Sequence, residues 1–126
     1  MPTPLHILIV DDNQEILDML RVMLGRQGYK VSTQSRMGDF TAQVTGLQPD
    51  IVLMDMKLGW ANGCDLCALV KTNKSLQHIP VIMFSAYHKV KEDCVMAGAD
   101  SFLEKPFEMG ELLHAIEKLT GQLSIE

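Results

Sequence analysis

The stretch that most constrains the fold is the apolar run Ile51-Val52-Leu53-Met54, which is flanked by Asp50 and Asp55. Consecutive apolar residues, some of them β-branched, are typical of a strand buried on both faces of a parallel sheet. Asp55 stands at the carboxyl end of this strand, and a polar, glycine-containing segment follows at 57–63. Ligands bind at that edge of open α/β sheets, so a carboxylate placed there indicates chemistry rather than packing.

Composition narrows the class of protein. The chain has 126 residues, the length of one domain, and its net charge of −5 argues against direct nucleic-acid binding, which requires a basic patch. No apolar run approaches the ~20 residues of a membrane span, and the first residues lack the features of a signal peptide. Three cysteines without secretory context fit a reducing compartment. We expect a cytoplasmic protein without membrane contact, folded as a single domain over 1–126 with its core at about 5–121.

Strand and helix patterns alternate along the chain. The other strands are expected at 5–10, 29–33, 79–84 and 100–104. Apolar residues at the 3.6-residue helical period indicate five helices that follow the strands. These helices are expected to end at Gly28, to span 37–46, to begin at Gly63, to span about 89–97, and to end at Gly121. The alternation predicts an α/β protein with a five-stranded parallel sheet and helices on both faces.

Apolar side chains at helical spacing define the expected buried faces. In the helix that begins at Gly63, these are Leu66, Leu69 and Val70. The nine methionines are expected mostly to fill the core, because methionine adapts to irregular gaps. Val22 faces away from the other apolar residues of the first helix, and we expect it to be exposed.

Polar side chains follow the predicted strands at their carboxyl ends. They are Asp11, Asp12, Asp55, Ser85 and Lys105. A parallel sheet places those ends along one edge, where two like charges ~4 Å apart repel by about 4 kcal/mol at an effective dielectric constant of 20. Lys105 offsets part of this repulsion, and the remainder indicates a divalent cation held by few carboxylates and several waters, as Mg²⁺ prefers. A carboxylate, Mg²⁺, a lysine and a hydroxyl are the components of phosphoryl transfer onto a carboxylate nucleophile.

The chain resembles the CheY-like receiver domains of two-component response regulators over essentially its whole length. The matching residues, in chain order, are Asp11-Asp12, Asp55, Asn62-Gly63, Ser85-Ala86 and Lys105-Pro106. The resemblance implies a doubly wound, flavodoxin-like sheet with strand order 2-1-3-4-5. It also implies a cis peptide bond between Lys105 and Pro106.

The resemblance assigns a role to each site residue. Asp55 would accept the phosphoryl group. Asp12 and Asp55 would ligate Mg²⁺ through their side chains, Lys57 through its backbone carbonyl, and Asp11 through a water molecule. Lys105 would pair with a phosphoryl oxygen and stabilise the charge that develops during transfer.

A switch between Ser85 and Phe102 is also implied. Phosphorylation adds roughly −1.5 to −2 charges and three acceptor oxygens, toward which Ser85 would move. Phe102 would then turn inward and reshape the surface formed by the fourth helix, the fifth strand and the last helix.

The function implied is that of a phosphorylation-dependent signalling switch rather than an enzyme, although the domain would assist its own phosphorylation and dephosphorylation. Its phosphodonor would be a sensor histidine kinase or a histidine phosphotransferase, docking on the helix that carries Val22. The output partner is not defined by the sequence, and we expect a monomer or a weak phosphorylation-dependent dimer. The sequence also does not separate a stand-alone regulator from one domain of a longer protein.

Two positions depart from the family pattern. Gly59 replaces the proline that usually stands four residues after the acceptor, and it should make the loop more mobile. Lys57 is an uncommon residue type beside the acceptor. We expect it to alter the access of the hydrolytic water and therefore the lifetime of the phosphoryl group.

Individual motifs also allow other interpretations. Asp11-Asp12 alone could merely cap a helix, with Asp12 or Asn13 as the capping residue. Cys64 and Cys67 form a C-x-x-C pattern at a helix start, where a thiolate is favoured, but a redox motif of this type belongs after a first strand. The four histidines show no ligand spacing, which argues against a zinc site.

Three other functions are considered. A phosphatase with an aspartate nucleophile needs a second acid two residues later, where this chain has Lys57. A flavodoxin-like cofactor binder needs a phosphate loop after the first strand, where Asp11 and Asp12 would repel a phosphate. An interaction module that no longer accepts phosphoryl groups would lack a site residue, and none is missing.

Overall fold

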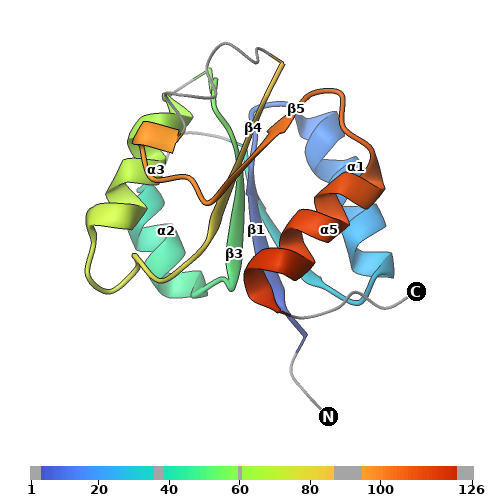
Figure 1. Cartoon of the computed structure of the whole chain (residues 1–126), viewed down its shortest axis with the longest axis horizontal. Coiled ribbons are helices and arrows are strands. Elements are labelled where there is room, and N and C mark those ends of the chain that lie inside the picture. The colour runs from blue at the N-terminus through green and yellow to red at the C-terminus, as the bar shows by residue number, and fades with distance from the viewer. Residues whose placement is uncertain (1–3, 36–38, 60, 87–94, 122–126) are drawn as a thin grey trace.

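A computed structural model of the chain describes residues 4–35, 39–59, 61–86 and 95–121 (Figure 1). The strands and helices of this part follow one another in alternation up to the fourth strand, as predicted. In chain order they are β1 (His6–Val10), α1 (Gln14–Arg26), β2 (Lys30–Gln34), α2 (Phe40–Leu47), β3 (Ile51–Asp55), α3 (Gly63–Thr72), β4 (Val81–Ser85), β5 (Ser101–Glu104) and α5 (Met109–Thr120).

The five strands form one parallel sheet with the order β2-β1-β3-β4-β5. This order confirms the doubly wound, flavodoxin-like topology implied by the resemblance. Helices α1 and α5 cover one face of the sheet, and α2 and α3 cover the other (Figure 1). The central strands are therefore buried on both faces, which explains why they are continuous apolar runs in the sequence.

Successive residues of each strand contribute to two separate cores. Ile7 and Ile9 of β1 belong to the cluster that contains the buried leucines of α1, whereas Leu8 and Val10 belong to the cluster on the α2 and α3 side. All four are fully buried. This division follows from the alternation of side chains along a strand.

Two aspartates connect neighbouring strands at their amino ends, opposite the edge where the carboxyl ends of the strands lie. The carboxylate of Asp50, just before β3, accepts a hydrogen bond from the backbone N–H of His6 at 2.7 Å. The carboxylate of Asp100, just before β5, accepts one from the N–H of Val81 at 2.8 Å and forms an ion pair with Lys71 at 2.7 Å. These carboxylates satisfy backbone groups that lie beyond the regular ladder.

The packing corrects two predictions from sequence. Leu69 is 48% exposed, and Cys67 instead lies with Leu66 and Val70 on the buried face of α3. The expectation that methionines mostly fill the core is wrong for several of those described: Met54 and Met83 are fully buried, but Met19 and Met96 are exposed. Val22 is 53% exposed, as the helical period predicted.

The predicted fourth helix lies mainly at positions outside the described residues. Its described end is helical at Val95 and Met96, and Gly98 follows with a φ of +97°. A positive φ at glycine is a common way for a helix to end. Among the helices of the described ranges, none has the length and hydropathy that crossing a membrane requires.

Candidate functional site

Three aspartates converge at the carboxyl edge of the sheet. Asp11 and Asp12 follow β1 directly, and Asp55 is the last residue of β3 beside it. One carboxylate oxygen from each of the three lies within 4.8 Å of the others. The parallel arrangement of β1 and β3 therefore brings together residues that are more than 40 positions apart in the chain.

Lys105 places a positive charge inside this cluster. Its Nζ lies 2.9 Å from Oδ2 of Asp55 and 3.4 Å from Oδ2 of Asp11. The backbone N–H of Lys105 donates to the carbonyl of Ser85 at 2.8 Å, which fixes the start of the side chain beside β4. The ammonium also lies 4.8 Å from the centre of the Phe84 ring, where a cation–π interaction is favourable. The peptide bond to Pro106 is cis, as the resemblance implied.

Asp11 is the most deeply buried carboxylate of the cluster, with 1% of its surface exposed. Burial raises the pKa of Asp11 above its ordinary value, while the backbone N–H of Asn13 and the ammonium of Lys105 act in the opposite direction. The Asn13 N–H donates to Oδ1 of Asp11 at 2.9 Å. A buried carboxyl of this kind is stabilised in its charged form by any cation that comes near it.

Asn13, rather than Asp12, caps α1. The Asn13 side chain accepts hydrogen bonds from the N–H groups of Glu15 and Ile16 at 3.0 and 3.3 Å. Capping therefore does not engage the carboxylate of Asp12, which is exposed and turns toward the β3–α3 loop. There, Oδ2 of Asp12 accepts the backbone N–H of Gly59 at 2.9 Å.

The β3–α3 loop is held by a short antiparallel bridge between Lys57 and Asn62. The two hydrogen bonds of this bridge run from Gly63 N–H to the Met56 carbonyl at 2.6 Å and from Leu58 N–H to the Ala61 carbonyl at 3.1 Å. The N–H of Lys57 donates to Oδ1 of Asp55 at 3.0 Å. The loop thus contacts the cluster through its backbone.

The Asn62-Gly63 pair has a structural reason that the sequence alone did not supply. Asn62 caps α3 by accepting the N–H of Cys64 at 2.8 Å. A Cβ atom on Gly63 would lie 2.3 Å from the backbone oxygen of Asp55, closer than real Cβ atoms approach. Only glycine allows α3 to begin this close to the end of β3.

Ser85 and Phe102, the predicted switch residues, lie on neighbouring strands. Ser85 is the last residue of β4 and is 2% exposed. Phe102 pairs with Met83 and packs, partly buried, against the core on the α2 and α3 side. Because residues two apart on a strand face the same side, Ser85 and Phe102 share one face of the sheet.

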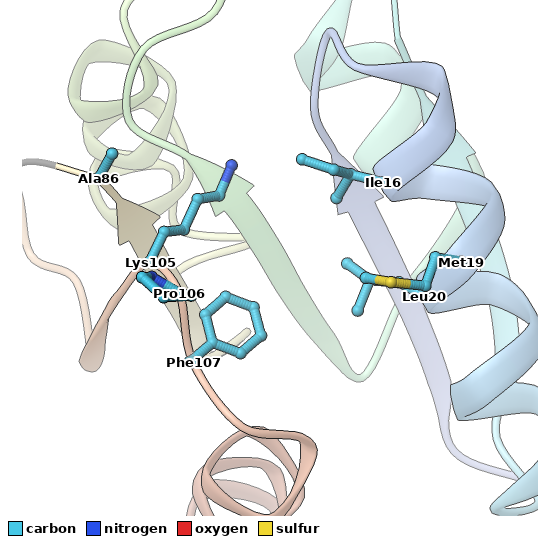
Figure 2. Close-up of a pocket in the computed structure, with 7 residues that line it drawn as sticks. All are labelled: Ile16, Met19, Leu20, Ala86, Lys105, Pro106 and Phe107. Carbon is cyan, nitrogen blue, oxygen red and sulfur yellow. The ribbon is translucent and has the colours of Figure 1, made fainter.

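A pocket of about 370 Å³ opens beside the cluster, between α1 and the segment that follows β5 (Figure 2). Its lining residues are Ile16, Met19, Leu20, Ala86, Lys105, Pro106 and Phe107. Lys105 reaches from the wall of this pocket toward the carboxyl end of β3 (Figure 2). The pocket is not predictable from the sequence, because its walls come from segments about 90 positions apart that no local pattern connects.

Cys67, the second cysteine of the C-x-x-C pattern, does not have the environment of a reactive thiol. Cys67 is buried, and its burial raises the pKa of the thiol to about 11. A reactive cysteine requires a lowered pKa and exposure. Cys94 lies outside the described residues.

The fold and the site together define a doubly wound α/β domain with an acidic, lysine-paired site at the carboxyl edge of its sheet. A family model described as the response regulator receiver domain matches residues 7–117. The chain belongs to this family, whose members are signalling regulators of two-component systems rather than classical enzymes.

Two similar proteins illustrate the range of lengths in the family. The chain is 34% identical to the transcriptional regulatory protein GltR of Pseudomonas aeruginosa over 115 residues, which cover 90% of this chain and 48% of GltR. It is 32% identical to protein PilG of the same organism over 117 residues, which cover 90% of this chain and 85% of PilG. The chain therefore spans about half the length of GltR but most of PilG.

A solved structure relates the fold to a metal site. The receiver domain of the sensor histidine kinase PA1611 from Pseudomonas aeruginosa is 26% identical, with a TM-score of 0.79 over 95% of this chain and 100% of that one. It has a magnesium ion coordinated in its active site cleft.

Proposed function

We propose that this domain is a switch in which Asp55 accepts a phosphoryl group from a phosphohistidine, with Mg²⁺ bound beside it. The observation that supports this most directly is the contact between Lys105 and Asp55 at 2.9 Å within a cluster of three carboxylates. A lysine at this distance is placed to pair with a phosphoryl oxygen on the acceptor, where it stabilises developing charge. The resemblance to receiver domains implies the same roles for Asp55 and Lys105.

The residues present fit Mg²⁺. The ligand atoms offered are all oxygens, as Mg²⁺ prefers, and three carboxylates against one ammonium leave an excess of negative charge. Asp12 and Asp55 would hold the ion through their side chains, Lys57 through its backbone carbonyl, and Asp11 through water. When bound, Mg²⁺ would neutralise charge on the phosphoryl oxygens during transfer.

The protein's own groups would promote the transfer by holding the reacting atoms in position. A carboxylate oxygen of Asp55 attacks phosphorus, a P–O bond forms as the P–N bond of the donor breaks, and the electron pair of that bond leaves with the imidazole. The N–H of Lys57, which already contacts Oδ1 of Asp55, keeps the carboxylate oriented. Lys105 then moves from the carboxylate onto a phosphoryl oxygen.

The signal would pass through Ser85 and Phe102. Ser85 would donate its hydroxyl to a phosphoryl oxygen and vacate space on the face of the sheet that it shares with Phe102. Phe102 would then turn inward and alter the surface of the predicted fourth helix, β5 and α5. Because Phe102 has no hydroxyl, its inward position gains packing without a hydrogen bond.

The partners follow from this mechanism. A sensor histidine kinase or a histidine phosphotransferase would dock against α1, where Val22 is half exposed and the half-exposed Met19 lines the pocket. The altered surface would act on an output domain or a separate protein, with at most weak dimerisation and without direct nucleic-acid contact. We place the domain in the cytoplasm, where such phosphodonors act.

A phosphatase remains less well supported, because Lys57 stands where that mechanism needs an acid. The deciding experiment is intact mass spectrometry after incubation with acetyl phosphate and Mg²⁺. We expect a gain of one phosphoryl group that is lost in Asp55→Asn and with a chelator, but retained in Asp18→Asn on the exposed face of α1. No gain in the wild type under any condition would leave only an interaction module.

A further inference from the structure

Each carboxylate of the cluster is held by one backbone N–H group. Asn13 N–H donates to Asp11 at 2.9 Å, Lys57 N–H donates to Asp55 at 3.0 Å, and Gly59 N–H donates to Asp12 at 2.9 Å. The last two donors come from the same loop, two residues apart. The β3–α3 loop therefore binds one carboxylate at the end of β3 and another in the segment that follows β1.

The hydrogen bond from the Gly59 N–H acts on Asp12, the least buried of the three carboxylates. Asp12 is exposed, whereas Asp11 is buried and Asp55 is mostly so. Oxygens of Asp11 and Asp55 within 4.8 Å repel the charge of Asp12, and an exposed side chain is free to turn away from them. A charge-assisted hydrogen bond from a fixed N–H opposes that movement.

The residue type at position 59 suits this contact. A Cβ atom on residue 59 would lie 3.1 Å from Oδ2 of Asp12, a tight approach that glycine avoids. The backbone there can consequently come close enough for its N–H to reach the carboxylate. A proline at this position would have no N–H to donate.

We propose that the N–H of Gly59 is a positioning group for the metal site, which holds Asp12 toward Asp55 before the cation binds. This inference rests on the proposed function, since it assumes that Asp12 is a Mg²⁺ ligand. It adds that Mg²⁺ affinity depends on the conformation of the β3–α3 loop, because that loop and Asp12 are linked by this bond.

The test compares Gly59→Pro with Gly59→Ala. Both add a Cβ atom beside Asp12, but only proline removes the N–H. Mg²⁺ is titrated into each protein and its dissociation constant is measured from the amide chemical shifts of the site. We expect Gly59→Pro to bind Mg²⁺ about tenfold more weakly than Gly59→Ala, the effect of losing one hydrogen bond to a charged group.

The outcomes separate this inference from the proposed function. If the wild type does not bind Mg²⁺, the proposed metal site itself is wrong. If the wild type binds Mg²⁺ and the two variants bind it equally, the positioning role of Gly59 is wrong, whether both are weakened or neither is.

A second measurement covers the case in which the proline variant does not fold. In metal-free wild-type protein, the Gly59 amide proton should resonate downfield and exchange slowly, because it is hydrogen bonded. In Asp12→Ala it should move upfield and exchange faster. An unchanged Gly59 amide in Asp12→Ala would overturn the inference.

Discussion

Lys105 is the residue on which the electrostatics of the site depend most. Its ammonium contacts both a buried carboxylate, Asp11, and the proposed acceptor, Asp55, and it lies over the Phe84 ring. Removing it would leave Asp11 without this cation in a setting where burial already raises the pKa of that carboxyl. Under the proposed function, the same residue would serve both the metal-free protein and the phosphorylated one.

We expect Lys105→Gln to reduce the rate of phosphorylation by acetyl phosphate by about 10²-fold, the effect typical of removing one group that stabilises a developing charge. The rate is measured by mass spectrometry at saturating Mg²⁺. Lys74→Gln, an exposed lysine outside the site, is the control and should retain the wild-type rate. An unaltered rate in Lys105→Gln would contradict the role given to this lysine.

His6 predicts a pH dependence of stability. Burial, and secondarily Lys30, lowers the pKa of His6 below 6.5 in the folded protein. The unfolded chain therefore takes up the proton more readily, so the free energy of unfolding should fall as pH decreases below about 6.5.

Urea unfolding between pH 7.5 and pH 5 checks this effect of His6. His6→Gln should flatten the dependence of unfolding free energy on pH, because glutamine does not titrate. Its amide can still hydrogen bond to Ser32, the present partner of Nε2 at 2.7 Å, so the folded structure is kept. His78→Gln, at an exposed histidine, should leave the slope unchanged. Equal slopes in all three proteins would assign the pH dependence to the carboxylates instead.

At the scale of elements, the junction between β3 and α3 has the least freedom. Gly63 starts the helix where a Cβ atom would meet the backbone of Asp55. We expect Gly63→Ala to lower the free energy of unfolding by about 1–3 kcal/mol or more, because backbone atoms cannot yield as a flexible side chain can.

The matched control is Gly110→Ala in α5, where a Cβ atom would meet nothing within 4 Å. Alanine is the better helix former, so this variant should be more stable by about 0.5–1 kcal/mol. Urea denaturation distinguishes the two signs. A neutral Gly63→Ala would mean that the junction can relax.

Strands and helices were predictable from sequence where the apolar residues follow a single unambiguous pattern. The central strands are apolar on both faces, and α5 carries a strict helical period, so both were found from residue types alone. The buried face of α3 was not predictable in this way. Leu69 and Cys67 both fit an apolar stripe, and only packing on the sheet selects Cys67. The exposed Met19 and Met96 show that an apolar residue need not lie inside.

The side chains of the site were predictable because their types are unusual at strand ends. Their backbone partners were not, because the N–H groups of Asn13, Lys57 and Gly59 carry no signature in residue type. The pocket beside α1 also depends on how distant segments pack. Sequence reasoning thus predicted which side chains meet at this edge of the sheet, while their supporting contacts needed coordinates.

At the scale of the whole molecule, the sheet separates two helical layers, and the site lies at its upper edge in Figure 1. Val22 on α1 and Leu69 on α3 are exposed to similar extents, 53% and 48%, but lie on opposite layers. Among the described residues, those that line the pocket with Lys105 include three of α1 and none of α3. A protein phosphodonor should therefore distinguish the two layers.

We expect Val22→Glu to lower kcat/KM for phosphotransfer from a histidine phosphotransferase by about tenfold, as for loss of an interface contact. Transfer from acetyl phosphate should not change, since the small donor needs no docking surface. Leu69→Glu should affect neither reaction. Sensitivity to both substitutions, or to neither, would contradict docking on α1.

The aspartates at the two ends of the sheet have opposite consequences for the folded chain. Asp50 binds a backbone N–H, so Asp50→Asn should lower the melting temperature by weakening a charged hydrogen bond. Asp12 also accepts a backbone N–H, from Gly59, but it stands among like charges. Relief of that repulsion should outweigh the weaker hydrogen bond, so Asp12→Asn should raise the melting temperature in a chelator while weakening Mg²⁺ binding. The same Asp→Asn change, tested at both ends of the sheet, would show that the domain sacrifices some thermal stability to keep a cation-binding site formed.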